Sequence, residues 1–329
     1  MVFDTRILIT GAGGFVGTWL RRCLKKDTRF RGPVFGTTIS DVASTDQEGT
    51  EWRSVDLRDA EAVDGLVAAI KPTVVLHLAA QAHVQQSLRF PDLTWSTNLN
   101  GTMNLAQAVL RHTPKCRFIF VSSSEVYGGS FRYAGVPLNE TALLDPENPY
   151  AASKAAADLL IGQMARQGLQ SLRLRPFNHS GPQQSEQFVV PDFAAQVVRI
   201  ERGEQNPVIS VGNLEPLRDF LDVRDVVSAY ATAILRPEPF TPGLILNLAS
   251  GLPRRIGSIL EALVSKSKAR IRIEIDPGKF RPNDTPFAAG DAGQARKNLD
   301  WQPNIAWDQT LDDILADLRS RPAKETAQH

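Results

Sequence analysis

Tyr150 and Lys154 lie one helical turn apart in the segment Tyr-Ala-Ala-Ser-Lys, so a helix would carry both side chains on one face. Ser123 follows the strand-like residues 118–122. A tyrosine, a lysine and a serine placed together can move a proton to or from a carbonyl or alcohol oxygen. We therefore predict that Ser123, Tyr150 and Lys154 form a catalytic set.

The protonation of Tyr150 decides what this set can do. A free tyrosine titrates near ~10, which is too high for easy proton exchange at neutral pH. We expect the ammonium group of Lys154 to lower the pKa of the phenol, and Tyr150 to act as the general acid in the reductive direction. The alternative is an ordinary surface pair on a helix, which is the usual meaning of an isolated Tyr-x-x-x-Lys.

A glycine loop near the start of the chain argues against that alternative. Gly11, Gly14 and Gly17 follow the strand-like residues 6–10 and open an amphipathic helix. Such a loop presents the free N–H groups of the helix start to a dinucleotide diphosphate. The spacing is Gly-x-x-Gly-x-x-Gly rather than Gly-x-Gly-x-x-Gly, and an ordinary tight turn is the competing interpretation.

The choice between NAD and NADP stays open. An acidic residue at the end of the second strand favours NAD, and an arginine there favours NADP. This chain has Gly-Thr-Thr-Ile-Ser at 36–40, followed by Asp41. Asp56 and Leu57, after the strand-like residues 51–54, are candidate contacts for the adenine; Asp56 could instead form a turn at the strand end.

Short apolar runs alternate with amphipathic segments through the first half of the chain, which predicts an α/β fold with a doubly wound parallel sheet. We expect strands near 7–10, 34–38, 74–78, 118–122 and 172–175, and helices near 15–26, 61–70, 93–111 and 150–167, with Asp59 as a helix N-cap. Later helices are expected near 193–201, 226–235, 256–265 and 305–319, with strands near 208–211, 218–223, 244–249 and 271–275.

These elements predict two domains. Residues 1–176 and 224–250 would form a Rossmann domain that binds the dinucleotide. Residues 177–223 and 251–329 would form a smaller, discontinuous α/β lobe that binds the substrate.

Composition narrows the class of protein. The chain has 329 residues, with 37 Lys and Arg against 36 Asp and Glu, and no basic run that predicts a nucleic-acid or membrane surface. No apolar stretch reaches the ~20 residues of a membrane span, and the first strand begins without a signal-like segment. Cys23 and Cys116 predict neither a disulfide nor a metal site. We expect a cytoplasmic protein.

The motifs together resemble the extended short-chain dehydrogenases/reductases, in the NAD-dependent epimerase/dehydratase group that acts on nucleotide sugars. The resemblance rests on residues 11–17, His-Leu-Ala-Ala-Gln at 77–81, Asn98 with Gly101 and Thr102, 122–128, 149–154, Arg-Pro-Phe-Asn-His at 175–179, Arg-Asp-Phe at 218–220 with Asp222, and Arg281 with the following proline. It implies cofactor contacts from Phe15, Val16, Leu78, Ala79, Ala80, Asn98, Val121, Pro176 and His179, besides the glycines, Tyr150 and Lys154. Asn98 could instead satisfy a buried helix end.

Glu125 raises the question of which sugar reaction is catalysed. The family's 4,6-dehydratases carry Thr-Asp-Glu or Thr-Ser-Glu where this chain has Ser123, Ser124 and Glu125, and their glutamate removes a proton beside a 4-keto group. Glu125 could act in the same way, or it could orient the pocket or hold a sugar hydroxyl. The two interpretations stay open.

Later segments resemble GDP-4-keto-6-deoxy-D-mannose reductases more closely. These are residues 175–182, 188–193 and 211–220, in which Ser-Gly-Pro at 180–182 replaces the Glu-Ser-Pro and paired arginines of GDP-mannose dehydratases. The resemblance implies NADPH- or NADH-dependent reduction of a GDP-linked 4-keto-6-deoxyhexose to GDP-D-rhamnose. GDP-mannose 4,6-dehydratase is the alternative enzyme, and a non-catalytic dinucleotide-sensing scaffold is the alternative from another class.

A nucleotide diphosphate needs cations, and we expect Arg218 and Arg281 to supply them. A local Arg218–Asp219 salt bridge and a solvated loop around Arg281 are the competing interpretations. Asn178 and Asp284 could bind phosphate and ribose hydroxyls, with Gln81, Ser124 and Glu125 nearer the sugar. Family members pair two helices into a four-helix interface, which implies a homodimer through 93–111 and 150–167.

Overall fold

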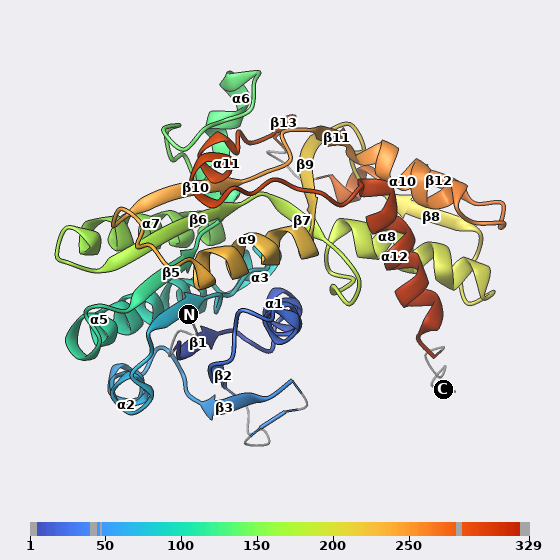
Figure 1. Ribbon diagram of the computed structural model, residues 1–329. Helices are drawn as coiled ribbons and strands as arrows, with labels where there is room; N and C mark the ends of the chain where they lie inside the picture. Colours follow the sequence, from blue (N-terminus) through green and yellow to red (C-terminus); the bar gives the residue numbers. More distant parts are fainter. Residues whose placement is uncertain (1–4, 40–44, 47, 281–284, 323–329) are drawn as a thin grey trace.

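A computed structural model describes residues 5–39, 45–46, 48–280 and 285–322. Its main sheet has seven parallel strands in the order β3-β2-β1-β4-β5-β6-β10 (Figure 1). The strands are β1 (Ile7–Thr10), β2 (Val34–Thr38), β3 (Thr50–Ser54), β4 (Val74–His77), β5 (Arg117–Val121), β6 (Gln170–Pro176) and β10 (Leu244–Leu248). The strand order reverses between β1 and β4, and ligands of doubly wound folds bind at the carboxyl edge beside such a reversal.

Helices cover both faces of this sheet, as expected for a doubly wound fold. One face carries α1 (Phe15–Lys26), α9 (Val223–Leu235) and α11 (Gly293–Leu299); the other carries α2 (Ala60–Ile70), α5 (Gly101–His112) and α7 (Pro149–Ala165). Buried aliphatic side chains of the strands fill the core on each side. The predicted parallel sheet is confirmed, and Asp59 caps α2 by accepting hydrogen bonds from the N–H groups of Glu61 and Ala62.

The expected helix over 93–111 is interrupted. The structure has α4 (Pro91–Trp95), a π-helical segment η1 (Ser96–Asn100) and then α5. A π-helical turn inserts an extra residue into the helix and rotates the side chains on either side of it. This turn contains Asn98, which is buried.

The rest of the chain has a core of its own, formed where α8 (Val189–Glu201), α10 (Ile256–Ser265) and α12 (Trp307–Ser320) pack together. Beside them lie the strand pair β8 (Val208–Val211) and β12 (Arg272–Ile275), and a sheet of β7 (Asn178–Ser180), β9 (Leu217–Asp222), β11 (Pro253–Arg255) and β13 (Phe287–Ala288). Short helical segments are α3 (Val84–Arg89), η2 (Ser124–Ser130), α6 (Phe131–Ala134) and η3 (Pro277–Lys279). The division into a cofactor domain and a substrate lobe stays a prediction.

Cys23 and Cys116 are both free thiols. Within the described ranges, no helix combines the length and the apolar character that crossing a bilayer requires.

Candidate active site

The glycine loop lies between β1 and α1, and its glycines are sterically required. Gly11 has a φ of +70°, and a Cβ atom there would lie 2.8 Å from the main-chain nitrogen of Ala79. A Cβ atom on Gly17 would lie 2.6 Å from the carbonyl oxygens of Gly11 and Ala12. Side chains at these positions would therefore push the loop away from the segment after β4, or the helix away from its own loop.

The start of α1 is suited to an anion. Gly14 is the N-cap residue, no side chain caps the helix, and its first turn contains no acidic residue. The first N–H groups of a helix have no intrahelical acceptor and carry the positive end of the helix dipole. The glycine loop and the uncapped N–H groups at the start of α1 therefore fit the diphosphate of a dinucleotide.

Phe15 connects this loop to β7. The rings of Phe15 and His179 are stacked, with 6.5 Å between their centroids and 7° between their planes. His179 is fixed by a hydrogen bond between its Nδ1 and the carbonyl oxygen of Phe177, at 2.9 Å. The structure thus brings these two predicted cofactor contacts together, although they are far apart in the sequence.

The other predicted cofactor positions gather at the same edge of the sheet. Leu78, Ala79 and Ala80 follow β4, Val121 ends β5 and Pro176 ends β6. Val16 lies in the first turn of α1. Because parallel strands share one carboxyl edge, these positions lie at the same edge of the sheet as the glycine loop.

Asp56 makes a local turn. Its carboxylate accepts hydrogen bonds from the main-chain N–H of Arg58, at 2.9 Å, and from the Arg58 guanidinium, which lowers the pKa of the carboxyl group. Leu57 is buried and lies against Gly101. The role of Asp56 and Leu57 in adenine binding stays a prediction, and Asp41 lies outside the described residues.

A buried chain of hydrogen bonds links β1, β4 and the helices after β4. The Thr102 hydroxyl donates to the carbonyl oxygen of Asn98 at 2.6 Å, so it accepts from Nε2–H of His77 at 2.8 Å. Nδ1 of His77 therefore accepts from the Thr10 hydroxyl at 2.6 Å. Burial, followed by the positive charge of Lys154, lowers the pKa of His77 to about 3. His77 is thus a neutral link between β1, β4 and α5.

Asn98 ties three segments together. Its amide oxygen accepts from the main-chain N–H of Gln81 at 2.7 Å, and its amide nitrogen donates to the carbonyl oxygen of Gln81 at 3.1 Å. The same nitrogen donates to the Ser153 hydroxyl at 2.9 Å. Ser153 in turn donates to the carbonyl oxygen of Tyr150 at 2.8 Å. Asn98 therefore fixes the loop after β4 against the helix that carries Tyr150.

The predicted catalytic side chains converge. Ser123 ends the loop after β5, is 8% exposed, and lies close enough to the Tyr150 phenol to act on its pKa. Its hydroxyl also accepts from the main-chain N–H of Glu125 at 3.1 Å. The neighbouring Ser124 is buried. Ser123 and Tyr150 thus form the contact that proton transfer to a substrate oxygen requires.

The prediction that Lys154 lowers the pKa of Tyr150 is wrong in this structure. Burial raises the pKa of the Tyr150 phenol to about 12, the hydrogen bond with Ser123 opposes this shift, and the negative charge of Glu125 adds to it. The phenol therefore holds its proton firmly, as a proton donor must before the reaction.

Lys154 has another main partner. Its ammonium donates to the carbonyl oxygen of Val121 at 2.5 Å and lies 4.4 Å from the ring centroid of Phe120. The side chain is 3% exposed. Burial lowers the pKa of Lys154 to about 7, and the carboxylate of Asp158, one turn along α7, acts in the opposite direction.

The loop after β4 presents unsatisfied polar atoms. Within the described residues, Oε1 of Gln81 and Nδ1 of His83 are buried without a hydrogen-bond partner. The His83 ring contacts the ring of Phe188 edge to face, with 6.0 Å between centroids. Unpaired buried acceptors are costly, so this loop is suited to receive the hydroxyls of a bound sugar.

Only some of the residues predicted to bind the substrate diphosphate and ribose lie in the described part of the chain. Asn178 and Arg218 lie on the paired strands β7 and β9, and Arg218 donates to the carbonyl oxygen of Leu217. The Asp219 carboxylate instead accepts from the main-chain N–H groups of Ser250 and Gly251, at 2.9 and 2.8 Å. Asp219 therefore stabilises the turn at Ser250 and Gly251. Arg281 and Asp284 lie outside the described residues.

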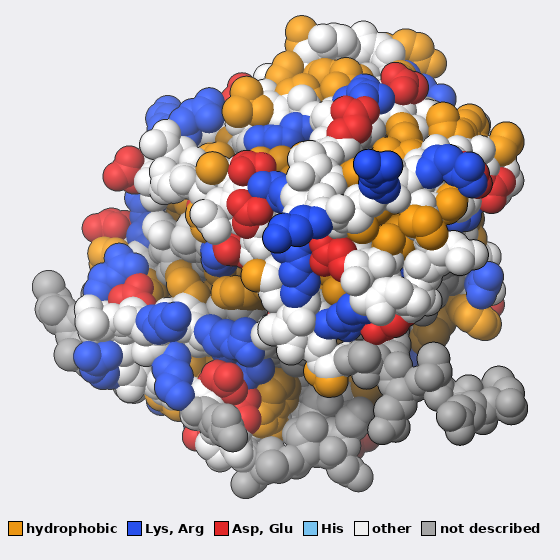
Figure 2. Space-filling model, turned by 90° about the vertical axis from the view of Figure 1, so that its right-hand side faces the viewer, with side chains coloured by type: hydrophobic (Ala, Val, Ile, Leu, Met, Phe, Trp, Pro, Cys, Tyr) orange, Lys and Arg blue, Asp and Glu red, His pale blue; other side chains and the backbone are white. Residues whose placement is uncertain are grey.

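Over its described part, the face of the molecule in Figure 2 has no large positive patch that could bind a diphosphate. The face in Figure 2, seen from the right-hand side of Figure 1, has basic and acidic side chains interspersed over its described residues. A diphosphate would thus depend on a few placed groups rather than on a positive face.

Sequence reasoning missed a buried ion cluster behind Lys154. Asp158 pairs with Arg175 through two hydrogen bonds of 3.0 and 2.9 Å, and with Arg173 at 2.9 Å. Arg175 also donates to the Tyr127 hydroxyl at 3.0 Å, which donates to Asn247 at 2.8 Å. An aspartate four residues after Lys154, in an otherwise apolar stretch of helix, was the available signal.

Comparison with known proteins identifies the family of this chain. The family model described as GDP-mannose 4,6 dehydratase matches residues 8–314. The chain is 33% identical over 321 residues to GDP-6-deoxy-D-mannose reductase from Pseudomonas aeruginosa, covering 97% of this chain and 99% of that protein. It is 26% identical to GDP-mannose 4,6-dehydratase from Vibrio cholerae, covering 94% and 92%.

A solved structure, RMD from Pseudomonas aeruginosa complexed with NADPH, superposes with a TM-score of 0.82 at 32% identity, covering 96% of this chain and 100% of that one. The seven-stranded parallel sheet, the glycine cradle and the Ser–Tyr–Lys set define an NAD(P)-dependent short-chain dehydrogenase/reductase of the extended type. Within that class, the chain belongs to the GDP-mannose 4,6-dehydratase family of nucleotide-sugar enzymes.

Proposed function

We propose that this protein uses NADPH or NADH to reduce the 4-keto group of a nucleotide-linked 4-keto-6-deoxyhexose, converting GDP-4-keto-6-deoxy-D-mannose to GDP-D-rhamnose in the cytoplasm. The observation that carries the proposal is the closeness of Ser123 to Tyr150, with Lys154 one helical turn further along α7. The chain is also 33% identical to GDP-6-deoxy-D-mannose reductase over 97% of its length. NADPH is the cofactor named with the similar Pseudomonas structure.

The proposed chemistry divides between cofactor and protein. The bound dinucleotide supplies the hydride for carbon 4. Its diphosphate would lie on the N–H groups at the start of α1, and its nicotinamide half beside Ala79 and Val121. Ser123 would hydrogen-bond the keto oxygen and hold it against the Tyr150 hydroxyl.

Tyr150 then gives its proton to the oxygen of carbon 4, so that the carbonyl becomes a hydroxyl. The raised pKa keeps the proton on the phenol until negative charge develops on the sugar oxygen. The ammonium of Lys154, which donates to the carbonyl oxygen of Val121 one helical turn from Tyr150, would also hydrogen-bond the ribose of the bound nicotinamide.

Product analysis tests this function. The protein is incubated with GDP-mannose, a known GDP-mannose dehydratase and each reduced cofactor, and the sugar is analysed by NMR. A 4-hydroxyl product formed with consumption of reduced cofactor supports the reductase and fixes its stereochemistry. An unreduced 4-keto sugar contradicts it. No turnover with any nucleotide sugar would support the non-catalytic scaffold.

Glu125 supports a second candidate, GDP-mannose 4,6-dehydratase. Its charge acts on the Tyr150 phenol, so it lies at the site where a base would remove the proton beside the keto group. A dehydratase regenerates its cofactor, and GDP-mannose alone would give a 4-keto product. Glu125→Gln should abolish that product while changing reduction of the 4-keto sugar less than about tenfold.

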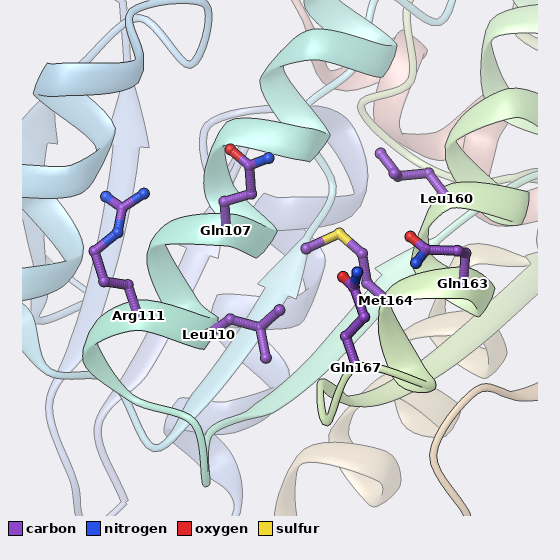
Figure 3. Close-up of a pocket in the computed structure, with 7 residues that line it drawn as sticks. All are labelled: Gln107, Leu110, Arg111, Leu160, Gln163, Met164 and Gln167. Atoms are coloured by element: carbon purple, nitrogen blue, oxygen red, sulfur yellow. The ribbon is translucent and has the colours of Figure 1, made fainter.

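We also propose a homodimer through α5 and α7. A groove of about 480 Å³ runs between them, lined by Leu110, Leu160 and Met164 among others, and Met164 reaches across it toward α5 (Figure 3). Leu159, which lies on α7, is 60% exposed. Leu159→Glu should convert a dimer to a monomer in light scattering, and Leu252→Glu, at another exposed leucine, should not. A wild-type monomer would contradict the proposal.

A further inference from the structure

A second pocket lies at the amino edge of the main sheet, opposite the glycine loop. It has a volume of about 890 Å³. Val74, Arg117 and Gln170, the first residues of β4, β5 and β6, line it together with the end of α9 and the loop before β2. A strand of four residues separates it from the proposed active site by roughly 13 Å.

The charges that line this pocket are all positive. They belong to Arg29, Lys115, Arg117 and Arg236, and no acidic residue lines it within the described ranges. Arg29 is neutralised by Asp27, at 2.6 Å. Lys115 has no ion-pair partner among the described residues and is exposed to the pocket mouth. The remaining cations thus leave an excess of positive charge on a concave surface.

Arg117 and Arg236 share one aromatic ring. Their guanidinium carbons lie 5.6 and 5.1 Å from the ring centroid of Phe240. Burial, followed by the charge of Arg236, lowers the pKa of Arg117. Two like charges are therefore held close together in a partly buried place, where an anion would relieve their repulsion.

In the described part of the chain, the carbonyl groups at the end of α9 pair with Arg117 and not with Arg236. Arg117 donates to the carbonyl oxygens of Ala233 and Ile234 at 2.9 and 3.1 Å, so it caps the helix. Nε of Arg236 is buried without a hydrogen-bond partner among the described residues. Glu238 comes no closer to that nitrogen than 3.6 Å, and its side chain is 68% exposed. The other end of the guanidinium is held in place, because Nη1 of Arg236 donates to the carbonyl oxygen of Asn298. The Nε donor is left without a partner among the described residues.

We propose that this pocket binds a small organic anion, with its phosphate or carboxylate group between Lys115 and Arg236 and its apolar body against Phe30, Val74 and Phe240. Charge-assisted hydrogen bonds would hold the anionic group, and the apolar wall would favour a ring or short hydrocarbon body. The site is independent of the proposed reaction, because none of its residues lies at the carboxyl edge.

The probe for this site is 1-naphthyl phosphate, followed by its fluorescence, with neutral 1-naphthol for comparison. The phosphate should bind at least tenfold more tightly than naphthol, and added salt should weaken it. Saturating NADPH and GDP-mannose should leave its binding unchanged. Equal binding of naphthol, or displacement of the probe by NADPH or GDP-mannose, would overturn the proposal.

Matched variants locate the anion. Arg236→Gln should weaken probe binding about tenfold, whereas Arg236→Lys, which keeps the charge, should weaken it less. Lys115→Gln should also weaken it, whereas Lys297→Gln, at an exposed lysine on α11, should not. Thermal melting checks that each variant is folded. A folded Arg236→Gln and a folded Lys115→Gln that both bind like wild type would contradict the site.

Discussion

The ammonium of Lys154 lies 2.5 Å from the carbonyl oxygen of Val121, where β5 ends. This contact fixes a buried cation one turn after Tyr150, between α7 and the carboxyl edge of the sheet. Loss of contact with water disfavours the charged form of each side chain, so it lowers the pKa of the lysine and raises that of the tyrosine.

The first prediction is a pH dependence. The pKa of Lys154 is lowered to about 7, so its charge is present below pH 7 and is lost as the pH rises through that value. The pKa of Tyr150 is about 12, so the phenol stays protonated over the same range. The kcat/KM for reduction should therefore be flat below pH 7 and fall by about tenfold per unit above it. Lys154→Arg should remove the fall, and a wild-type rate that is constant to pH 9 would contradict this.

The glycine cradle gives the second prediction. Gly11→Ala places a Cβ atom 2.8 Å from the main chain of Ala79, in a backbone conformation that costs about 1–2 kcal/mol for other residues. It should lower the thermal stability and weaken NADPH binding, measured by calorimetry.

Gly65→Ala is the matched control for that change. Gly65 lies inside α2, and a Cβ atom there would meet nothing within 4 Å. This variant should gain up to ~1 kcal/mol of stability and bind NADPH normally. Equal effects of the two substitutions would show that the loop has no special role.

Asn98 gives the third prediction. Asn98→Ala leaves the N–H and carbonyl of Gln81 without their partners, which costs about 1–3 kcal/mol. Because Gln81 and Ser153 border the site, the variant should also raise the KM for cofactor or substrate. Asn100→Ala, at an exposed position in the same π-helical segment, should change neither quantity. Normal kinetics in Asn98→Ala would contradict the positioning role.

Local patterns in the sequence predicted much of the fold. The bounds of β1, β2 and α1 follow from short apolar runs and from the glycines between them, and the edge that gathers the site follows from strand order. The π-helical segment could not be predicted, because its apolar spacing also suits an α-helix. The segment contains Asn98, which pairs with Gln81 across 17 positions of the sequence, and such a contact cannot be read from local spacing.

The directions of the pKa shifts of Tyr150 and Lys154 could also not be predicted from the sequence. The spacing of Tyr150 and Lys154 predicted their proximity, but burial depends on the whole sheet and on the helices packed over it. The contact of Asp158 with Arg175 likewise joins α7 to β6. Such long-range contacts decide the direction of a pKa shift, and helical spacing does not contain them.

The most direct test of the account is a single turnover of Tyr150→Phe with bound NADPH and GDP-4-keto-6-deoxy-D-mannose. Removing the phenolic hydroxyl removes the proton donor and little else, so we predict unchanged NADPH binding and a loss of about a hundredfold to ten-thousandfold in the rate of NADPH oxidation. Oxidation at the wild-type rate in this variant would contradict the central claim that Tyr150 protonates the sugar oxygen.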